Sequence, residues 1–392
     1  MKLKLLLFSL ILTVSVRAQS DGILALLNSD FYKEQFTGFY LYDPQSGELL
    51  SDFNGEKYFT PASNVKILTL YSAMKSLPDS IPALRYERIN GDLYIEGLGD
   101  PTFLHPEFKS VNRILDWLKN EEGKIYLHWG KFEGPRMGLG WSWEDYEKSF
   151  SAEISEFPIN ENSVNIQKTK NKFYIGSRNG NNTKVPFVVK DELIRQMLSD
   201  LTGKEIELTN KKLSDKAKVL FSVPSDLVYK RMMEVSDNFL AEQLMLMVSA
   251  QISNSMSTEK AINYIQNKYL KEMPQKAVWV DGSGLSRYNL FSPRDMVFVL
   301  DKLYGDFPKD RLFNIFAVGG KTGTLKSNYG GTVPYVYAKS GTLSNNYSLS
   351  GYLITNSGRL LIFSLMNNHY LKENWQVRKE NQKLLEYIRD NY

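Results

Sequence analysis

Cysteine is absent from the 392-residue chain, and only three histidines occur, His105, His128 and His369, far apart in the sequence. The absence of cysteine excludes disulfide bonds, a thiol nucleophile, and zinc or iron–sulfur sites built on cysteine. Three scattered histidines do not favour a histidine-rich metal centre, and they provide few candidates for a histidine-dependent catalytic triad. We therefore expect no metal site.

An excess of charge of one sign is also missing. The sequence has 48 Lys and Arg against 44 Asp and Glu, a net charge of +4. Such a balance is not typical of proteins that bind nucleic acid, so we expect no nucleic-acid partner. Hydrophobic residues make up 42% of the chain, which is enough for one large core or two smaller ones and excludes a disordered or fibrous protein.

Residues 1–18 have the pattern of a secretory signal peptide. Two lysines precede an apolar run that ends at Leu12, and Val16 and Ala18 stand three and one residues before a cleavage point. A membrane anchor would need about 20 apolar residues, and this run is shorter. No later segment is long and apolar enough to span a bilayer. We therefore expect export to the periplasm and no transmembrane segment after signal cleavage.

The rest of the sequence predicts two structural parts. Both ends of the chain combine strand patterns with helical apolar periodicity, whereas residues 80–216 are rich in Gly, Asn and aromatic residues with short strand patterns. We expect residues 19–79 and 217–392 to form one discontinuous domain, an antiparallel sheet flanked by helices, and residues 80–216 to be an inserted accessory domain. The predicted strands are 36–42, 48–53, 335–343, 347–355 and 359–367, and the predicted helices are 64–77, 227–248, 258–270 and 373–392.

A first candidate for chemistry is Ser63 with Lys66, which stand three residues apart at the start of a predicted helix. This spacing puts the hydroxyl and the amine on one helix face, where a lysine can activate a serine nucleophile. The spacing alone is weak, because Ser257 and Lys260 share it at the start of a charged helix, and Ser63 could be an ordinary helix cap. The helix after Ser63 is mostly apolar, so its lysine must be buried or functional.

A second candidate is Ser236-Asp237-Asn238, which precedes a strongly apolar helical stretch. Three small polar residues at the rim of a buried helix deliver hydroxyl and amide groups to one place. Helix capping is the alternative interpretation.

The third candidate is a lysine followed by a hydroxyl residue and glycine on a strand, since such an edge can bind a carboxylate and an extended peptide. Lys321-Thr322-Gly323 is the more literal match, but glycines and turn residues surround it. Lys339-Ser340-Gly341-Thr342 lies within a strand pattern that begins at Tyr335 and continues into two further strands. Strand context therefore favours Lys339.

The order of the three motifs, Ser63 to Lys66, Ser236 to Asn238 and Lys339 to Gly341, resembles that of penicillin-binding proteins and serine β-lactamases. The wider chain is similar to the D-alanyl-D-alanine carboxypeptidase/endopeptidase family, the low-molecular-mass class C penicillin-binding proteins. This resemblance implies an α+β transpeptidase fold, with a five-stranded antiparallel sheet flanked by helices and an inserted β-rich module. Further stretches that resemble the family are Gly91-Asp92-Leu93-Tyr94, Gly99-Asp100-Pro101, Gly140-Trp141-Ser142-Trp143 and Asp281-Gly282-Ser283-Gly284-Leu285-Ser286.

The same resemblance implies a mechanism without metal or organic cofactor, in which Ser63 is acylated by a D-alanyl-D-alanine peptide of peptidoglycan. β-Lactam antibiotics are expected to acylate the same serine. The resemblance implies that Lys66 is the base, that Ser236 relays a proton, and that Asn238 holds the amide of the acyl chain. Lys339 and Ser340 would bind the terminal carboxylate, and Gly341 and Thr342 would belong to the substrate-binding strand. The backbone amides of Ser63 and Thr342 would stabilise the oxyanion.

Three features leave alternatives open. The catalytic strand has Ser340 where the family usually has threonine. Asp145 could bind a cationic peptide side chain such as diaminopimelate, or could be a surface carboxylate beside packed aromatic residues. A serine β-lactamase would share all three motifs, and Glu259 with Asn263 has the spacing that class A β-lactamases use for deacylation. Besides the peptidase and the β-lactamase, a non-catalytic binding protein on the same fold is the third possibility.

Overall fold

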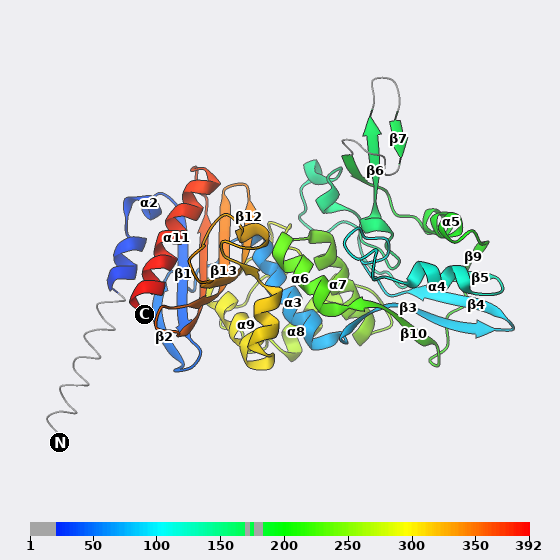
Figure 1. Ribbon diagram of the computed structural model, residues 1–392, viewed down its shortest axis with the longest axis horizontal. Helices are drawn as coiled ribbons and strands as arrows, with labels where there is room; N and C mark the ends of the chain where they lie inside the picture. Colours follow the sequence, from blue (N-terminus) through cyan, green and yellow to red (C-terminus); the bar gives the residue numbers. More distant parts are fainter. Residues whose placement is uncertain (1–20, 169–172, 176–182) are drawn as a thin grey trace, which may run out of the picture.

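The computed structural model describes residues 21–168, 173–175 and 183–392 (Figure 1). The expected signal peptide, residues 1–18, lies outside the described residues. Within the described part, three sheets organise the chain: one of six strands, one of five and one of three. Figure 1 shows helices α3, α6 and α7, of residues Val65–Ser76, Ser225–Val235 and Asn238–Ile252, between the six-stranded and five-stranded sheets.

The six-stranded sheet joins the two ends of the chain. Its neighbouring strands are antiparallel in the order β11-β12-β13-β14-β1-β2, and Leu41 of β1 faces Phe363 of β14. The predicted antiparallel sheet is therefore confirmed, with six strands instead of five because Ala317 and Val318 pair with Ala338 and Tyr337. The strands are β1 (Phe36–Asp43), β2 (Glu48–Phe53), β11 (Ala317–Val318), β12 (Val336–Leu343), β13 (Asn346–Ile354) and β14 (Leu360–Asn368).

Both faces of this sheet are covered, because strand residues alternate between two cores. On β14, Ile362 and Met366 belong to the core shared with the central helices, whereas Phe363 and Leu365 face the opposite core. The C-terminal helix α11 (Asn374–Asn391) and the short α2 (Asp30–Lys33) cover the second face. The core on the first face is shared with α3, α6, α7, α8 (Thr258–Lys268), α9 (Pro293–Asp306) and α10 (Lys309–Ile315).

One predicted helix is broken. The periodicity over 227–248 predicted a single helix, but α6 ends at Val235 and α7 begins at Asn238. Between them Ser236 has φ +63°, a left-handed conformation that ends the first helix, and Asp237 caps the second. Apolar periodicity runs through both helices because both face the same core, so it does not reveal the break.

The segment predicted as a β-rich insert is a mixed α/β structure. Its five-stranded sheet has the order β10-β3-β4-β5-β9, with β5 parallel to both neighbours. The sequence analysis did not predict its two helices. In one of them, α5, only Ile194, Leu198 and Thr202 are buried, so the apolar face is too narrow to give clear helical periodicity. Strand β10 lies beyond residue 216, so this sheet includes residues that the sequence analysis placed in the other part. The elements are β3 (Ser80–Ile89), β4 (Asp92–Gly97), α4 (Ile114–Asn120), β5 (Ile125–His128), α5 (Asp191–Thr202), β9 (Ile206–Thr209) and β10 (Lys218–Pro224).

A small three-stranded sheet, β7-β6-β8, extends from this part in Figure 1. Its strands are β6 (Ser163–Lys168), β7 (Phe173–Ile175) and β8 (Thr183–Pro186). None of the helices in the described ranges combines the length and the apolar character that crossing a bilayer requires.

Candidate active site

Ser63 lies in a tight turn at the entrance to α3. A 3-10 turn, η1 (Ala62–Asn64), precedes the helix, and Ala62 has φ +48°, a conformation that costs energy for a residue with a side chain. The half-buried Ser63 hydroxyl accepts a hydrogen bond from Lys66 Nζ at 3.0 Å. The N-cap residue of α3 is Asn64, and no side-chain cap is formed there. The capping alternative therefore does not account for Ser63.

Lys66 is fully buried, and its amine joins three segments of the chain. Besides Ser63, Nζ donates to Asn238 Oδ1 at 2.7 Å and to the Ser283 carbonyl at 2.7 Å. Three acceptors match the three hydrogens of an ammonium group. In the resting site Lys66 is therefore placed as the charged form, with Ser63 accepting one of its hydrogens.

The second motif faces the same amine from the break between α6 and α7. Asp237 Oδ1 accepts from the Leu240 amide at 3.1 Å, so Asp237 alone supplies the helix cap. Capping thus leaves Ser236 and Asn238 available. The half-buried Ser236 hydroxyl has no hydrogen bond to any described residue, while Asn238 Nδ2 donates to the Phe150 carbonyl at 3.1 Å. Phe150 belongs to a 3-10 turn, η3 (Ser149–Ser151).

Strand β12 brings the third motif against the Ser63 turn. A side chain at Gly341 would place its Cβ 2.7 Å from both the Ser63 nitrogen and the Pro61 oxygen, so only glycine permits this approach. Lys339 is fully buried, and its Nζ donates to the Ser340 carbonyl at 2.6 Å. Lys321, by contrast, is exposed on the segment after β11. The geometry thus supports Lys339 as the motif lysine, as strand context predicted.

The two buried lysines differ in their counter-charges. Burial lowers the pKa of Lys66 to about 8, although the carboxylates of Asp281, Glu242 and Asp237 act in the opposite direction. Burial and the charge of Lys66 lower the pKa of Lys339 well below its ordinary value. Because Lys66 has nearby carboxylates and three acceptors, it holds a proton more readily than Lys339 in the free site.

Two buried acids that the sequence analysis missed hold the Ser283 carbonyl in place. Glu242 accepts from the amides of Gly282 at 3.0 Å and Ser283 at 2.7 Å. Asp281 accepts from the amides of Gly284 and Ser286 at 2.8 and 2.7 Å. Burial and the charge of Asp281 raise the pKa of Glu242 to about 7. The sequence signal that could have revealed Glu242 is the presence of a glutamate among the apolar residues 239–248.

Asp145 belongs to a segment that contacts the site, but no hydrogen bond joins it to a motif residue. It ends a 3-10 turn, η2 (Trp143–Asp145), and is half-buried. The surrounding segment is tied to the site at two points, where Trp141 Nε1 donates to Asp281 Oδ2 at 3.0 Å and Asn238 donates to Phe150. Among the described residues the Asp145 carboxylate has no hydrogen bond or ion pair, so it is available to a ligand.

The glutamate and asparagine that the β-lactamase alternative requires at the nucleophile lie on a different element. Glu259 and Asn263 are both exposed on α8. They line a cavity of about 410 Å³ together with Glu242 and Asp281, and none of the three motifs contributes to its lining. The hydrogen-bond partners of Lys66 do not include either residue. The spacing in the sequence therefore does not place this pair at the nucleophile.

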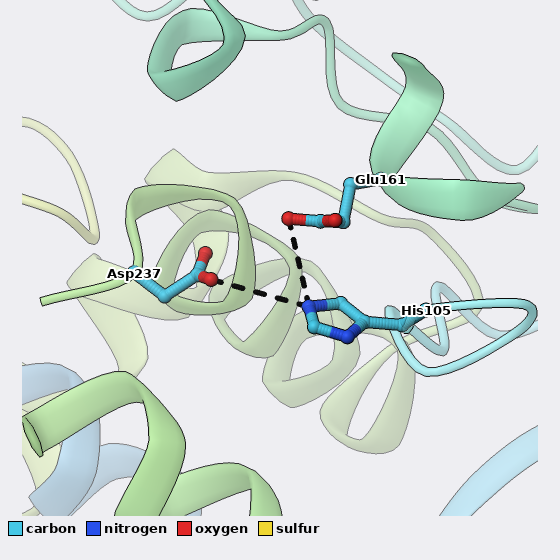
Figure 2. A group of neighbouring side chains, drawn as sticks. All are labelled: His105, Glu161 and Asp237. Carbon is cyan, nitrogen blue, oxygen red and sulfur yellow. Dashed lines mark ion pairs between the residues drawn. The ribbon is translucent and has the colours of Figure 1, made fainter. Parts of the chain in front are cut away.

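One side-chain group among the described residues has the spacing of a metal site, His105 with Glu161 and Asp237 (Figure 2). The buried His105 Nε2 lies 3.5 Å from Glu161 Oε1 and 4.0 Å from Asp237 Oδ2. However, Nδ1 accepts a hydrogen bond from the Glu107 amide at 3.2 Å. The neutral ring must then carry its proton on Nε2, which presents a hydrogen and no lone pair to a cation. We interpret the group as a polar contact at the start of α7.

Comparison with known proteins identifies the family of the chain. The model of the D-Ala-D-Ala carboxypeptidase 3 (S13) family matches residues 23–186 and 188–391. The chain is 23% identical to D-alanyl-D-alanine carboxypeptidase DacB of Haemophilus influenzae, over 91% of this chain and 90% of that protein. It is 26% identical to carboxypeptidase Rv3627c of Mycobacterium tuberculosis, over 79% of this chain and 71% of that one.

Solved structures show the same fold. Penicillin-binding protein 4 of H. influenzae superimposes with a TM-score of 0.72 at 20% identity, covering 93% of this chain and 98% of that one. A predatory peptidoglycan endopeptidase of Bdellovibrio bacteriovorus superimposes with a TM-score of 0.55 at 19% identity, covering 89% and 92%. Because the family model spans nearly all of the described structure, the chain belongs to the D-Ala-D-Ala carboxypeptidase 3 (S13) family.

Proposed function

We propose that the protein is a serine D-alanyl-D-alanine carboxypeptidase/endopeptidase that hydrolyses peptidoglycan peptides through an acyl-enzyme on Ser63. The supporting observation is the convergence of the Ser63 hydroxyl, the Lys66 amine and the Asn238 amide beside strand β12. The serine oxygen attacks the carbonyl carbon between two D-alanines, the terminal D-alanine leaves as an amine, and water then hydrolyses the ester. No step requires a metal or an organic cofactor.

Proton transfer in this mechanism begins at Lys66. To accept the serine proton, Lys66 must first lose one of its own, which its pKa of about 8 permits near neutral pH. The terminal carboxylate of a substrate at Lys339 and Ser340 supplies the counter-charge that Lys339 lacks. It thereby favours the charged form of Lys339. Ser236, whose hydroxyl has no hydrogen bond to a described residue, relays the proton to the leaving amine.

The developing oxyanion is stabilised by backbone amides. We assign the amides of Ser63 and Thr342 to this role, because Gly341 allows β12 to approach the Ser63 nitrogen closely. Each such donor contributes about 3 to 4 kcal/mol to the stabilisation of the transition state in comparable hydrolases. Asn238, through its amide, holds the acyl chain of the substrate.

The substrate class follows from the groups that surround the nucleophile. Lys339 and Ser340 bind a terminal carboxylate, and Asp145, whose carboxylate has no partner among the described residues, binds a cationic side chain such as that of diaminopimelate. Cross-linked stems would make the enzyme an endopeptidase. β-Lactams acylate Ser63 as substrate mimics; solved relatives include penicillin-binding protein 4 of H. influenzae complexed with a β-lactam and a penicillin G-acylated endopeptidase of B. bacteriovorus. The N-terminal signal pattern supports export of this activity to the periplasm.

Labelled penicillin tests the proposal. Purified protein and a Ser63→Ala variant are incubated with the label, and the adduct is located by peptide mass. We expect a stable adduct on the peptide that contains Ser63 and none in the variant. Rapid loss of the label would favour a β-lactamase instead. No adduct on either protein, with both folded by circular dichroism, would favour a non-catalytic binding protein.

A further inference from the structure

The Lys321-Thr322-Gly323-Thr324 segment, whose lysine lies away from the nucleophile, reaches the site through its last residue. Thr324 Oγ1 lies 2.6 Å from Ser340 Oγ, a hydrogen bond in which either hydroxyl can donate. Ser340 is the hydroxyl residue of the β12 motif and is buried, whereas Thr324 is half-buried. The two alternative lysine motifs of the sequence, at Lys321 and at Lys339, are therefore in contact in the fold.

The segment around Thr324 is fixed on three sides. Thr324 lies in a 3-10 turn, η5 (Gly323–Leu325), and the side chain of Leu325 is fully buried in the core beneath the sheet. Thr322 Oγ1 accepts from the Val318 amide at 3.0 Å. Gly323 has φ +53°, and a Cβ there would lie 2.0 Å from the Glu234 carbonyl on α6. The Thr324 hydroxyl is therefore held by backbone packing, between the end of α6 and strand β12.

The chemistry of Ser340 explains why such a fixed partner matters. Threonine is branched at Cβ, so few orientations of its hydroxyl are open to it, whereas serine rotates more freely. A serine hydroxyl has one hydrogen and two lone pairs. If Thr324 donates into one lone pair, the Ser340 hydrogen remains free for a substrate carboxylate.

We propose that Thr324 is a positioning residue that orients the Ser340 hydroxyl toward the terminal carboxylate of the substrate. It thereby supplies the restraint that a threonine at position 340 would provide by its own branching. This inference rests on the proposed function, because it assumes that Ser340 binds that carboxylate. It assigns a role to the segment that sequence analysis set aside as a competing motif.

The test uses two acyl donors that differ in one group. One is a peptide ending in D-alanyl-D-alanine with a free carboxylate, and the other is a thioester donor whose leaving group ends in a neutral amide. We expect Thr324→Ala to lower kcat/KM for the carboxylate donor about tenfold, mainly through KM, because a hydrogen bond to a charged group is lost. The neutral donor should be unaffected, and Thr324→Ser should retain the wild-type values.

A rescue experiment separates orientation from general damage. Ser340→Thr combined with Thr324→Ala should recover most of the lost kcat/KM, since the branched side chain orients its own hydroxyl. Lys321→Ala, in the same segment but exposed, is the matched control and should equal the wild type on both donors. Equal losses on both donors, no loss at all, or no rescue by the double variant would each overturn the proposal. Penicillin labelling of wild-type Ser63 tests the proposed function separately, so the two can fail independently.

Discussion

Lys66 and Asn238 are 172 residues apart in the sequence, yet the Lys66 amine donates to the Asn238 amide oxygen at 2.7 Å in the interior of the protein. This bond ties the helix that follows Ser63 to the helix that follows Ser236. It orients Asn238 so that its oxygen faces the lysine and its nitrogen faces outward to the Phe150 carbonyl. The proposed base and the amide proposed to hold the substrate are therefore positioned by one contact.

The close approach of β12 to the nucleophile predicts the effect of Gly341→Ala. The added Cβ would lie 2.7 Å from the Ser63 nitrogen, so β12 must move away from Ser63 and separate the two amides proposed to bind the oxyanion. We expect penicillin acylation to slow by about 100-fold, the effect that loss of one oxyanion donor typically has. Gly305→Ala in α9 is the control, since a Cβ there meets nothing within 4 Å, and it should leave acylation unchanged. Equal rates for the two variants, measured by stopped-flow labelling, would contradict the assignment.

The choice between the two lysine motifs predicts opposite outcomes. Lys339→Ala removes the buried amine that is proposed to bind the carboxylate, and labelling by penicillin should fall at least 100-fold. Lys321→Ala removes an exposed amine and should label normally. Because Lys339 is buried, a thermal melt should accompany the assay to show that the variant is folded. Normal labelling of folded Lys339→Ala would show that the wrong strand was assigned.

The pKa of Lys66 predicts the pH dependence of acylation. Only the free amine accepts the serine proton, so the acylation rate should rise with pH and level off above about 8. Glu242 raises the pKa of Lys66, so Glu242→Gln should move the midpoint to lower pH. Asp301→Asn, at a half-buried acid that does not contribute to the pKa of Lys66, is the control. An unchanged midpoint in Glu242→Gln would show that this carboxylate does not act on the base.

The Asp145 carboxylate, which has no partner in the described part of the chain, predicts a change in substrate preference. Asp145→Asn should lower kcat/KM about tenfold for stem peptides with a cationic side chain, because one charge-assisted contact is lost. Peptides with a neutral residue at that position, and penicillin, should react as with the wild type. Glu144→Gln, at the exposed neighbouring position, serves as the matched control. The same loss on cationic and neutral peptides would indicate a structural role for Asp145 instead.

Several features of this protein follow from the sequence alone. Strand alternation and helical periodicity are local signals, so the predicted terminal strands and most helices agree with the structure to within a few residues. The three motifs and their order indicated the family, which the family match confirms. The absence of cysteine and the scattered histidines left serine and lysine as candidates for catalysis, and the apolar helix after Ser63 distinguished Ser63 and Lys66 from Ser257 and Lys260.

Tertiary packing decided the rest, because it depends on residues far apart in the chain. Periodicity could not show the left-handed Ser236 that separates two helices on one core. Burial agrees with strand context in favouring Lys339 over Lys321, and it revealed Glu242 close enough to act on the pKa of Lys66. The hydrogen bond between Thr324 and Ser340 depends on the packing of η5 against α6 and on the burial of Leu325 in the core. Neither of these contacts can be predicted from a local sequence pattern.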